Sequence, residues 1–181
     1  MRYKTGLRSR SGIQRTRGPG RWRFVAAIAA ACGVSVASQA HAEDQIVKLV
    51  SSQSGKCLQP IKNSHTQGDA IVQETCDGSP AQQWTVHEVN STAVHLINGS
   101  SHLCMDARGK AVEGTPIQQW PCNGITNEYW GFGITNNTLS SGIHGGAWTQ
   151  CIATPGAQDG LPMELRGCDL DPSQIWSRPP G

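Results

Sequence analysis

One unit of about 46 residues recurs three times along this chain, and that repeat restricts the fold more than any other feature. Landmark residues keep the same phase in all three copies. Three sets recur every 46 residues: the tryptophans Trp84, Trp130 and Trp176; the cysteines Cys76, Cys122 and Cys168; and the glycines Gly68, Gly114 and Gly160. A second set of cysteines, Cys57, Cys104 and Cys151, recurs every 47 residues. Internal periodicity of this length predicts an architecture made of one repeated supersecondary unit. The units cover about residues 45–90, 91–137 and 138–177.

Apolar residues keep the same phase and mark the expected core. Leu49, Leu96 and Ile143 precede the first cysteine of each unit, Leu58, Met105 and Ile152 follow it, and Ile71, Ile117 and Met163 follow the repeated glycine. Short apolar runs between Gly- and Pro-rich turns predict many short strands, hence an all-β protein. The three units use nearly all of residues 43–181, which we expect to form one domain with no room for a separate catalytic domain.

Residues 1–42 resemble a secretory signal peptide. Eight Arg and Lys residues between Arg2 and Arg23 precede an apolar run from about Phe24 to Val36, and small residues follow. This order of charge, apolar run and small-residue site is typical of a signal peptide, with cleavage expected after Ala42 or, as the alternative, after Ala40. A membrane anchor is the competing interpretation, but the run is shorter than the roughly 20 residues that span a bilayer. We therefore expect a secreted, extracellular protein without membrane insertion.

The charge of the expected mature chain excludes several partners. All 13 acidic residues lie from Glu43 onward, whereas only seven of the 15 basic residues do, which gives a net charge of −6 with histidines neutral. A chain this acidic, without a stripe of Lys and Arg, is a poor ligand for nucleic acid or for anionic membranes. No metal- or cofactor-binding motif is present, so we expect no cofactor.

The cysteines predict a disulfide framework. Cys32 lies in the expected signal, which leaves six cysteines, two in each unit. Six cysteines allow 15 pairings, and the repeat selects the one within units: Cys57–Cys76, Cys104–Cys122 and Cys151–Cys168. Loops of this size stabilise by about 3 kcal/mol each in the chain-entropy model. Zinc binding is the alternative, but the spacings lack a C-x2-C pair and export favours oxidation.

A tripeptide that ends in tryptophan closes each unit. The three copies are Gln82-Gln83-Trp84, Glu128-Tyr129-Trp130 and Gln174-Ile175-Trp176. Three Gln-x-Trp motifs in phase, one of them altered, with one cysteine pair per unit, resemble the ricin-type β-trefoil lectins over about residues 45–177. The resemblance implies a β-trefoil of three four-stranded units related by a pseudo-threefold axis. We interpret these tryptophans as structural landmarks of the fold, with direct contact to a ligand as the alternative.

The strand before the second cysteine differs between the units. In the second unit it contains Ile117, Gln118 and Trp120; since side chains alternate along a strand, Ile117 pointing inward places Gln118 and Trp120 outward. The Trp120 position is Glu74 in the first unit and Arg166 in the third, which indicates a hydrated position. An outward tryptophan is typical of sugar recognition, because indole stacks on the apolar face of a pyranose. A stray exposed tryptophan, or an edge covered by a loop, is the alternative.

The second unit alone carries the residues of a ricin-type galactose site. By resemblance the carbohydrate-binding residues are Asp106, Gln118, Trp120, Asn127 and Glu128. The corresponding residues of the first unit include Gln59, Val72, Glu74 and Ala81, and those of the third include Ala153, Glu164, Arg166 and Ser173. We expect neither of these units to bind galactose. Taken alone, an aspartate such as Asp106 is more often just a turn residue, so the prediction depends on the five residues together.

Glu128 departs from the family pattern, which has glutamine there. An ionised glutamate cannot donate a hydrogen bond to Asp106, and two adjacent carboxylates repel, so one of the two pKa values should rise. We therefore hypothesise that Glu128 is partly protonated or turned away, and that binding depends on pH. The substitution leaves open which sugar is preferred.

Two other functions remain as alternatives. Glycosidases use a pair of carboxylates, and Asp106 with Glu128 is such a pair, but no catalytic signature accompanies it, so we expect a lectin without enzymatic activity. A protein-binding trefoil, such as a toxin delivery subunit or a protease inhibitor, is the second alternative. Trp148, three residues before Cys151, is either an exposed contact residue or a cap on the barrel. The expected partners are glycans carrying galactose or a related sugar.

Overall fold

The computed structural model describes residues 43–133, 135–143 and 148–181. The expected signal peptide and its cleavage sites, Ala40 and Ala42, lie outside the described residues. The described residues belong to one compact unit that ends at Gly181. Within these ranges no helix has the length and apolarity needed to cross a membrane.

Each of the three units contains four main strands that follow one another in the same order along the sequence. The first strands are β2 (Val50–Ser51), β6 (Val94–Asn98) and β10 (Leu139–Ser141). The second strands are β3 (Cys57–Pro60), β7 (Cys104–Ala107) and β11 (Gln150–Ala153). The third strands are β4 (Ile71–Glu74), β8 (Ile117–Trp120) and β12 (Glu164–Gly167). The fourth strands are β5 (Trp84–Glu88), β9 (Trp130–Phe132) and β13 (Trp176–Ser177).

Short elements complete the fold. An additional strand, β1 (Gln45–Val47), pairs antiparallel with β5. The 3-10 helices are η1 (Ile61–Asn63), η2 (Pro80–Gln82), η3 (Thr126–Glu128) and η4 (Pro172–Gln174). Three of them, η2, η3 and η4, lie just before the closing tryptophan of a unit, so each carries the first residue of its Gln-x-Trp or Glu-x-Trp motif.

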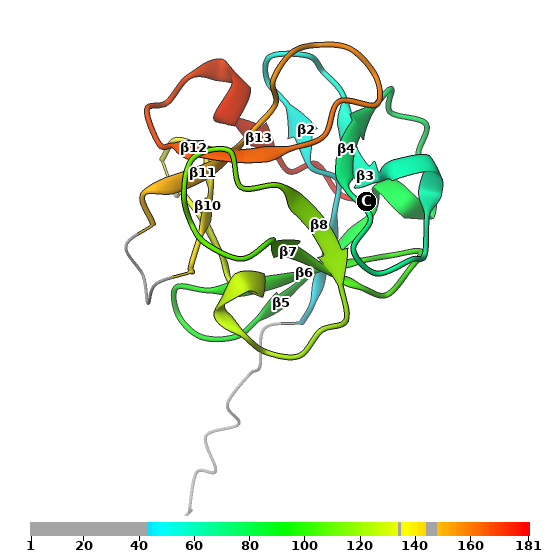
Figure 1. Cartoon of the computed structure of the whole chain (residues 1–181). Coiled ribbons are helices and arrows are strands. Elements are labelled where there is room, and N and C mark those ends of the chain that lie inside the picture. The colour runs from blue at the N-terminus through cyan, green and yellow to red at the C-terminus, as the bar shows by residue number, and fades with distance from the viewer. Residues whose placement is uncertain (1–42, 134, 144–147) are drawn as a thin grey trace, which may run out of the picture. The chain divides into compact units, whose positions relative to one another are not determined.

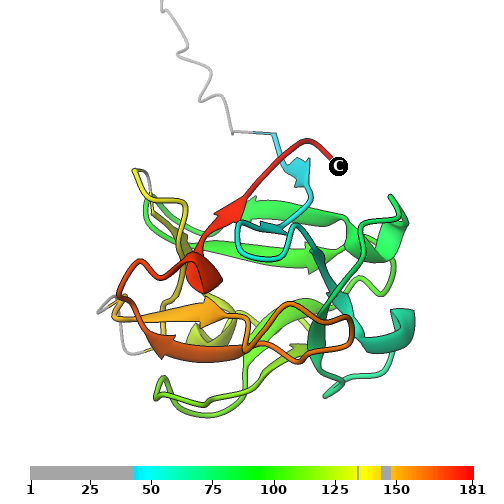
Figure 2. The same cartoon turned by 90° about the horizontal axis from the view of Figure 1, so that it is seen from above.

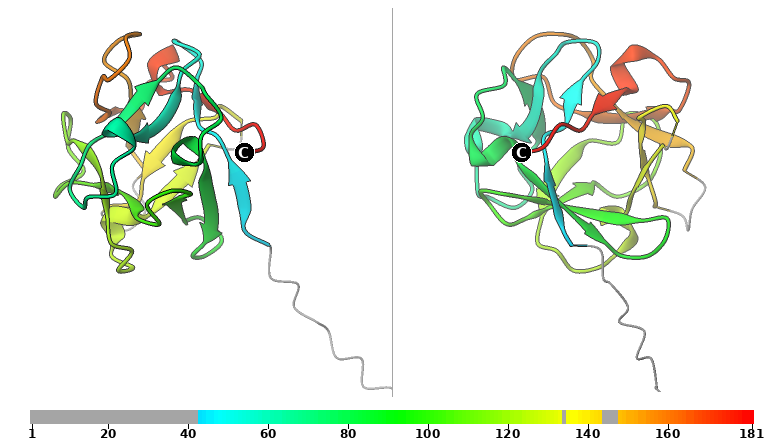
Figure 3. Two further views of the ribbon diagram at one scale, coloured as in Figure 1. Left: turned by 90° about the vertical axis from the view of Figure 1, so that its right-hand side faces the viewer. Right: turned by 180° about the vertical axis from the view of Figure 1, so that it is seen from behind.

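Antiparallel pairing follows the repeat. In every unit the second and third strands form a hairpin: β3 with β4, β7 with β8 and β11 with β12. The fourth strand of each unit pairs with the first strand of the next, and β13 returns to β2, so the third unit closes onto the first (Figure 1). Seen from above and from behind, the strand pairs surround a common centre (Figures 2 and 3). This is a β-trefoil, as the repeat and the resemblance predicted.

The repeated glycines lock the units together. The backbone N–H of each donates to a carbonyl on the third strand of the following unit in the ring: Gly68 to Gln119, Gly114 to Leu165 and Gly160 to Gln73, at 2.7–2.9 Å. Their φ angles are +86°, +80° and +78°, a left-handed conformation that favours residues without a Cβ. The repeat therefore retains glycine where the chain must turn left-handed to reach its neighbour.

The core contains the residues that the repeat predicted. All nine phase-locked apolar positions are buried, together with Trp84, Trp130 and Trp176. Each indole N–H donates to a carbonyl on the second strand of its own unit: Trp84 to Leu58, Trp130 to Met105 and Trp176 to Ile152, at 2.9–3.1 Å. The interpretation of these tryptophans as structural landmarks is confirmed, because no part of the ring remains for a ligand.

The three disulfides have the predicted pairing. Cys57 is bonded to Cys76, Cys104 to Cys122 and Cys151 to Cys168, and each pair has its Cα atoms 5.1 Å apart. Each bond ties the second strand of a unit to the chain just after its third strand. The bond between Cys104 and Cys122 therefore holds the β7–β8 hairpin, which supplies most residues of the candidate site.

Leu170 occupies a position that the other units fill with glycine. Its φ is +67°, and the equivalent residues Gly78 and Gly124 have φ of +76° and +75°. A left-handed conformation costs a residue with a Cβ about 1–2 kcal/mol, partly offset by the extra freedom of glycine in the unfolded chain. Leu170→Gly should thus stabilise the fold by about 0.5–1 kcal/mol in urea unfolding. Leu170→Ala is the control; a gain equal to that of glycine would contradict the strain argument.

Candidate functional site

Asp106 and Gln118 form the centre of the candidate site. They are direct cross-strand partners on β7 and β8, and Gln118 Nε2 donates to Asp106 Oδ1 at 2.7 Å. Asp106 is only 2% exposed and Gln118 only 7%. One carboxylate oxygen is therefore held by an amide inside the protein, and the sequence prediction that these two residues act together is consistent with this contact.

The expected outward orientation of Gln118 is wrong in one respect, because a loop of the first unit covers it. Ala70 forms an isolated bridge with Gln118, and Gly68 N–H donates to Gln119 O. Gln119, on the other face of β8, is fully buried too. Alternation along the strand holds, but both faces are packed, since the trefoil lays a neighbouring loop along this strand.

Trp120 is half-buried at the end of β8. A Cβ placed on Gly68 would lie 3.6 Å from Trp120 Cζ3, so the indole borders the same loop of the first unit. The two alternatives for this residue are thus combined: the loop covers part of the ring, and part remains accessible.

Arg108 is a site residue that the sequence reasoning missed. Its Nε donates to Gln118 Oε1 at 2.7 Å, and its Nη2 donates to Gly68 O at 2.8 Å. The guanidinium thereby fixes the Gln118 amide so that its nitrogen faces Asp106. The signal in the sequence was the spacing, because Arg108 lies two residues after Asp106 and so on the same side of the chain.

Glu128 keeps the acceptor role of the glutamine it replaces. Its carboxylate accepts from the backbone N–H groups of Asn123 and Gly124 at 3.0–3.2 Å, as Gln82 Oε1 accepts from Asp77 and Gly78 in the first unit. The carboxylate is thus turned toward backbone amides, which agrees with the hypothesis that Glu128 is turned away from the sugar site.

The pKa that rises is that of Asp106. Burial is the largest cause, and the negative charge of Glu128 adds to it. The hydrogen bond from Gln118 and the positive charge of Arg108 act in the opposite direction, because both favour the ionised form. A raised pKa at the central acceptor makes hydrogen bonding by this site sensitive to acid.

Asn127 lies at the margin of this arrangement. It is half-buried on η3, which packs beside β7 and thus near Asp106. Among the described residues, no hydrogen bond joins its side chain to the other four predicted site residues. The structure therefore joins Asp106 and Gln118 directly, places Glu128 near enough for its charge to act on Asp106, and leaves Trp120 and Asn127 at the edges.

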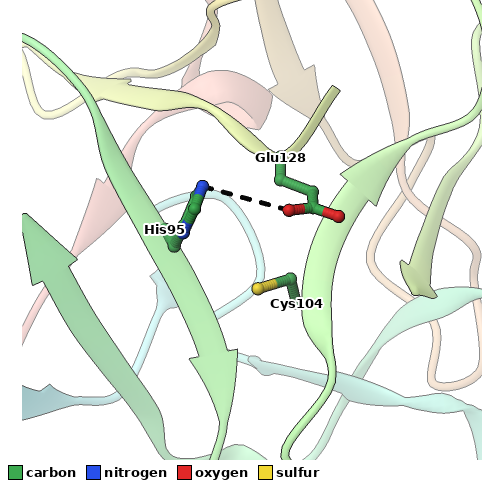
Figure 4. A group of neighbouring side chains, drawn as sticks. All are labelled: His95, Cys104 and Glu128. Carbon is green, nitrogen blue, oxygen red and sulfur yellow. Dashed lines mark ion pairs between the residues drawn. The ribbon is translucent and has the colours of Figure 1, made fainter. Parts of the chain in front are cut away.

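His95 and Cys104 lie behind Glu128 (Figure 4). His95 Nε2 is 3.9 Å from Glu128 Oε2, is buried and has no hydrogen-bond partner among the described residues. Burial, followed by the charge of His87, lowers the pKa of His95. The sulfur of Cys104 is bonded to Cys122, so the group offers only two free ligand atoms. That is fewer than the three or four protein ligands of a zinc site.

The equivalent positions of the other units are arranged differently. In the first unit Gln82 Nε2 donates to Gln59 Oε1 at 2.8 Å, so two neutral amides replace the carboxylates. In the third unit Arg166 pairs with Glu164 at 2.6 Å. A hollow of about 500 Å³ opens beside this ion pair and is lined by polar residues that include Asp169, Asp171 and Ser173. These arrangements lack the carboxylate, amide and indole set of the second unit.

A family model described as "Ricin-type beta-trefoil lectin domain-like" matches residues 20–120 and 81–157. No curated protein matches the chain significantly.

Solved structures share the fold. A designed threefold-symmetric protein, ThreeFoil, has a TM-score of 0.67 at 19% identity, over 74% of this chain and 96% of that one. The exo-β-1,3-galactanase of Clostridium thermocellum has a TM-score of 0.69 at 26% identity, over 76% of this chain and 30% of that one. The C-terminal half of an earthworm R-type lectin in complex with GalNAc has a TM-score of 0.60 at 13% identity, over 76% of this chain and 99% of that one.

Proposed function

Because this chain belongs to the ricin-type β-trefoil lectin domain-like family, we propose that it is a secreted lectin with a galactose-type site in the second unit. Residues 1–42 act as the signal peptide and residues 43–181 as the lectin domain. The observation that carries the proposal is the hydrogen-bonded pair of Asp106 and Gln118 beside the half-buried Trp120. This combination occurs in the second unit and at neither equivalent position.

The proposed division of labour follows from the chemistry of each group. Asp106, ionised, accepts from sugar hydroxyls with the oxygen that Gln118 does not use. Asn127 donates and accepts at the margin, and Trp120 stacks on the apolar face of the pyranose. Glu128 acts indirectly, through its charge on Asp106. The GalNAc bound by the earthworm lectin and the galactanase activity of the bacterial enzyme support a galactose-related ligand.

We propose binding without catalysis. Both oxygens of Glu128 accept backbone hydrogen bonds, which leaves this carboxylate poorly placed to activate water or to protonate a leaving group. The chain spans only 30% of the galactanase, so the activity of that enzyme belongs to a longer protein. Release of reducing sugar from a galactan by the purified chain would overturn this part of the proposal.

Trp120→Ala should weaken binding of a galactoside about 30-fold. The indole covers about 80 Å² of apolar sugar surface, which at 25 cal/mol/Å² corresponds to about 2 kcal/mol. Affinity for the strongest ligand on a glycan array, measured by calorimetry for parent and variant, checks this expectation. Ile46→Ala, at an exposed residue of β1, is the control and should bind as the parent does. Unchanged affinity in Trp120→Ala, with the fold intact by circular dichroism, would contradict the proposed site.

A further inference from the structure

The third unit departs from the repeat at Trp148. The first and second units have Ser54 and Ser101 there, and each hydroxyl donates to a buried glutamine on the third strand of its own unit, Ser54 to Gln73 and Ser101 to Gln119, at 2.8 Å. The third unit has the buried Leu165 in place of that glutamine. Serine and glutamine have been exchanged as a pair, so Trp148 does not perform the structural role of this position.

Two glycines make room for the indole of Trp148. A Cβ on Gly131 would lie 2.9 Å from its Cε3 and Cζ3 atoms, and a Cβ on Gly142 would lie 2.9 Å from its Cη2. The equivalent residues of the other units have side chains: Gly131 of the second unit corresponds to Thr85 and Ser177, and Gly142 of the third unit corresponds to Lys48 and His95. The ring therefore lies against the main chain of β9 and the end of β10. Three coordinated departures from the repeat place one tryptophan.

The backbone of Trp148 is strained. Its φ is +44°, a left-handed value that is an outlier for a bulky residue. Such conformations cost about 1–3 kcal/mol, persist only when the surroundings impose them, and cluster at ligand-binding sites. The side chain is partly buried rather than enclosed in the core. Packing against Gly131 and Gly142 holds the residue in this conformation and leaves part of the indole accessible.

Two hollows adjoin at Trp148. One has a volume of about 440 Å³ and lies between the β5–β6 turn and strands β9 and β10; Glu88, Phe132 and Ser140 help to line it. The other has a volume of about 210 Å³ and reaches Tyr129. Both are lined by Trp148, Asn90 and Thr92. Together they fall in the size range of small-molecule sites, with aromatic walls and a rim of hydroxyl and amide groups.

We propose that this groove is a second saccharide site, which takes a neutral pyranose and does not require the site of the second unit. The indole offers an apolar face to the C–H groups of a sugar ring. Asn90 Oδ1 accepts hydrogen bonds from the backbone N–H groups of Thr92 and Ala93 and from the Thr92 hydroxyl, which leaves the Asn90 amide nitrogen to donate to a ligand. The hydroxyls of Thr92 and Ser140, which donate to Asn90 Oδ1 and Gly131 O, retain their acceptor capacity.

The charge of the lining selects between classes of glycan. Among the residues that the structure describes, Glu88 is the one charged residue that lines either hollow, and it is exposed. A carboxylate without a cation among its lining neighbours repels sialylated or sulfated sugars and leaves neutral ones unaffected. The groove therefore takes neutral sugars.

The indole N–H resonances of the full chain test this proposal. Trp84, Trp130 and Trp176 donate internally, so Trp120 and Trp148 are the two indoles of the described residues that a sugar can reach. In a Trp120→Ala background, methyl glycosides of galactose, N-acetylgalactosamine, glucose and mannose are titrated into ¹⁵N-labelled protein. The peak that disappears in Trp148→Phe identifies the Trp148 resonance. We expect at least one neutral glycoside to shift it, with a Kd of about 1 mM.

Two surface variants keep the test independent of folding. Thr92→Val should weaken the effect on the Trp148 peak severalfold, and Glu88→Gln should strengthen binding of sialyllactose about two- to fivefold by removing a like charge. No shift of the Trp148 peak by any neutral glycoside would overturn the proposal. A shift of the Trp120 peak alone in the parent would also overturn it while supporting the second-unit site. A shift of the Trp148 peak alone would support it and contradict the second-unit site.

Discussion

Trp130→Ala is expected to destabilise the fold by about 3–5 kcal/mol, the range found for removal of a fully buried large aromatic side chain. Trp130 is fully buried, and its indole donates to Met105 O on β7, the strand that carries Asp106. The substitution leaves a cavity at the centre of the second unit and a buried carbonyl without its donor. Urea unfolding with the disulfides intact measures the change.

The matched control for this prediction is Trp120→Ala. Both substitutions remove one indole from the second unit, but Trp120 is half-buried and donates no hydrogen bond among the described contacts. We expect Trp120→Ala to cost less than about 1.5 kcal/mol, as is usual for a side chain without full burial. Equal losses in the two variants would show that the distinction between structural and ligand-facing tryptophans is wrong.

Glu128→Gln is the second substitution with a large expected effect, and it should stabilise the protein by about 1–3 kcal/mol at neutral pH. The glutamine of the first unit shows why: Gln82 accepts two backbone hydrogen bonds with its oxygen and donates to Gln59 Oε1 and Thr75 O with its nitrogen. Glu128 keeps the acceptor half and has no donor. An amide would restore a hydrogen bond to Asp106 and remove a buried like charge.

The same variant should change how binding depends on pH. Burial and the charge of Glu128 raise the pKa of Asp106, so the ionised acceptor is lost as pH falls through that raised value. Removing the charge lowers the pKa, and binding in Glu128→Gln should persist to lower pH than in the parent. Galactoside affinity from pH 5 to 8 for both proteins is the measurement. Identical curves would exclude a role for Glu128 in ligand binding.

Stability and binding should respond to acid in opposite directions. The folded protein favours the neutral form of Asp106, because its pKa is raised. That contribution to stability is complete below the unfolded pKa of about 4 and is lost as pH rises through the folded pKa. The pKa of His95, whose Nε2 is 3.9 Å from Glu128, is lowered by burial, so this imidazole becomes charged at a more acidic pH than a free histidine does. Within the Asp106 window, therefore, the parent should lose affinity while Asp106 itself adds stability.

Two saccharide sites on one chain would increase the avidity of the protein for a surface that carries many glycans. A single weak site, with a Kd of about 1 mM, holds a cell surface poorly. Linked sites raise the effective concentration of the second binding event and increase avidity without any new contact. If both the second-unit site and the Trp148 groove bind neutral sugars, one chain can bridge two glycans without forming an oligomer.

The sequence by itself determined the architecture. Its repeat predicted the three units, the pairing of Cys104 with Cys122, the core positions and the burial of Trp130, and all of these are confirmed. The physical reason is that threefold repetition supplies an internal comparison: a residue type kept in every copy satisfies a requirement of the fold. For example, every unit keeps a glycine at the position of Gly68, because the left-handed φ and the hydrogen bond to the next unit recur in all three.

Only the tertiary structure decided which contacts are made by the residues that differ between the units. Gln118 is buried because a loop of the first unit covers β8, Arg108 aligns the Gln118 amide, and Glu128 caps backbone amides. The space around Trp148 depends on glycines 17 and 6 residues earlier in the chain, at 131 and 142. Two of these arrangements join different units: Ala70 of the first unit covers Gln118 of the second, and Gly131 of the second unit borders Trp148 of the third. Such contacts follow from the packing of the units, and the contacts within a unit depend on side-chain orientations that the repeat does not specify.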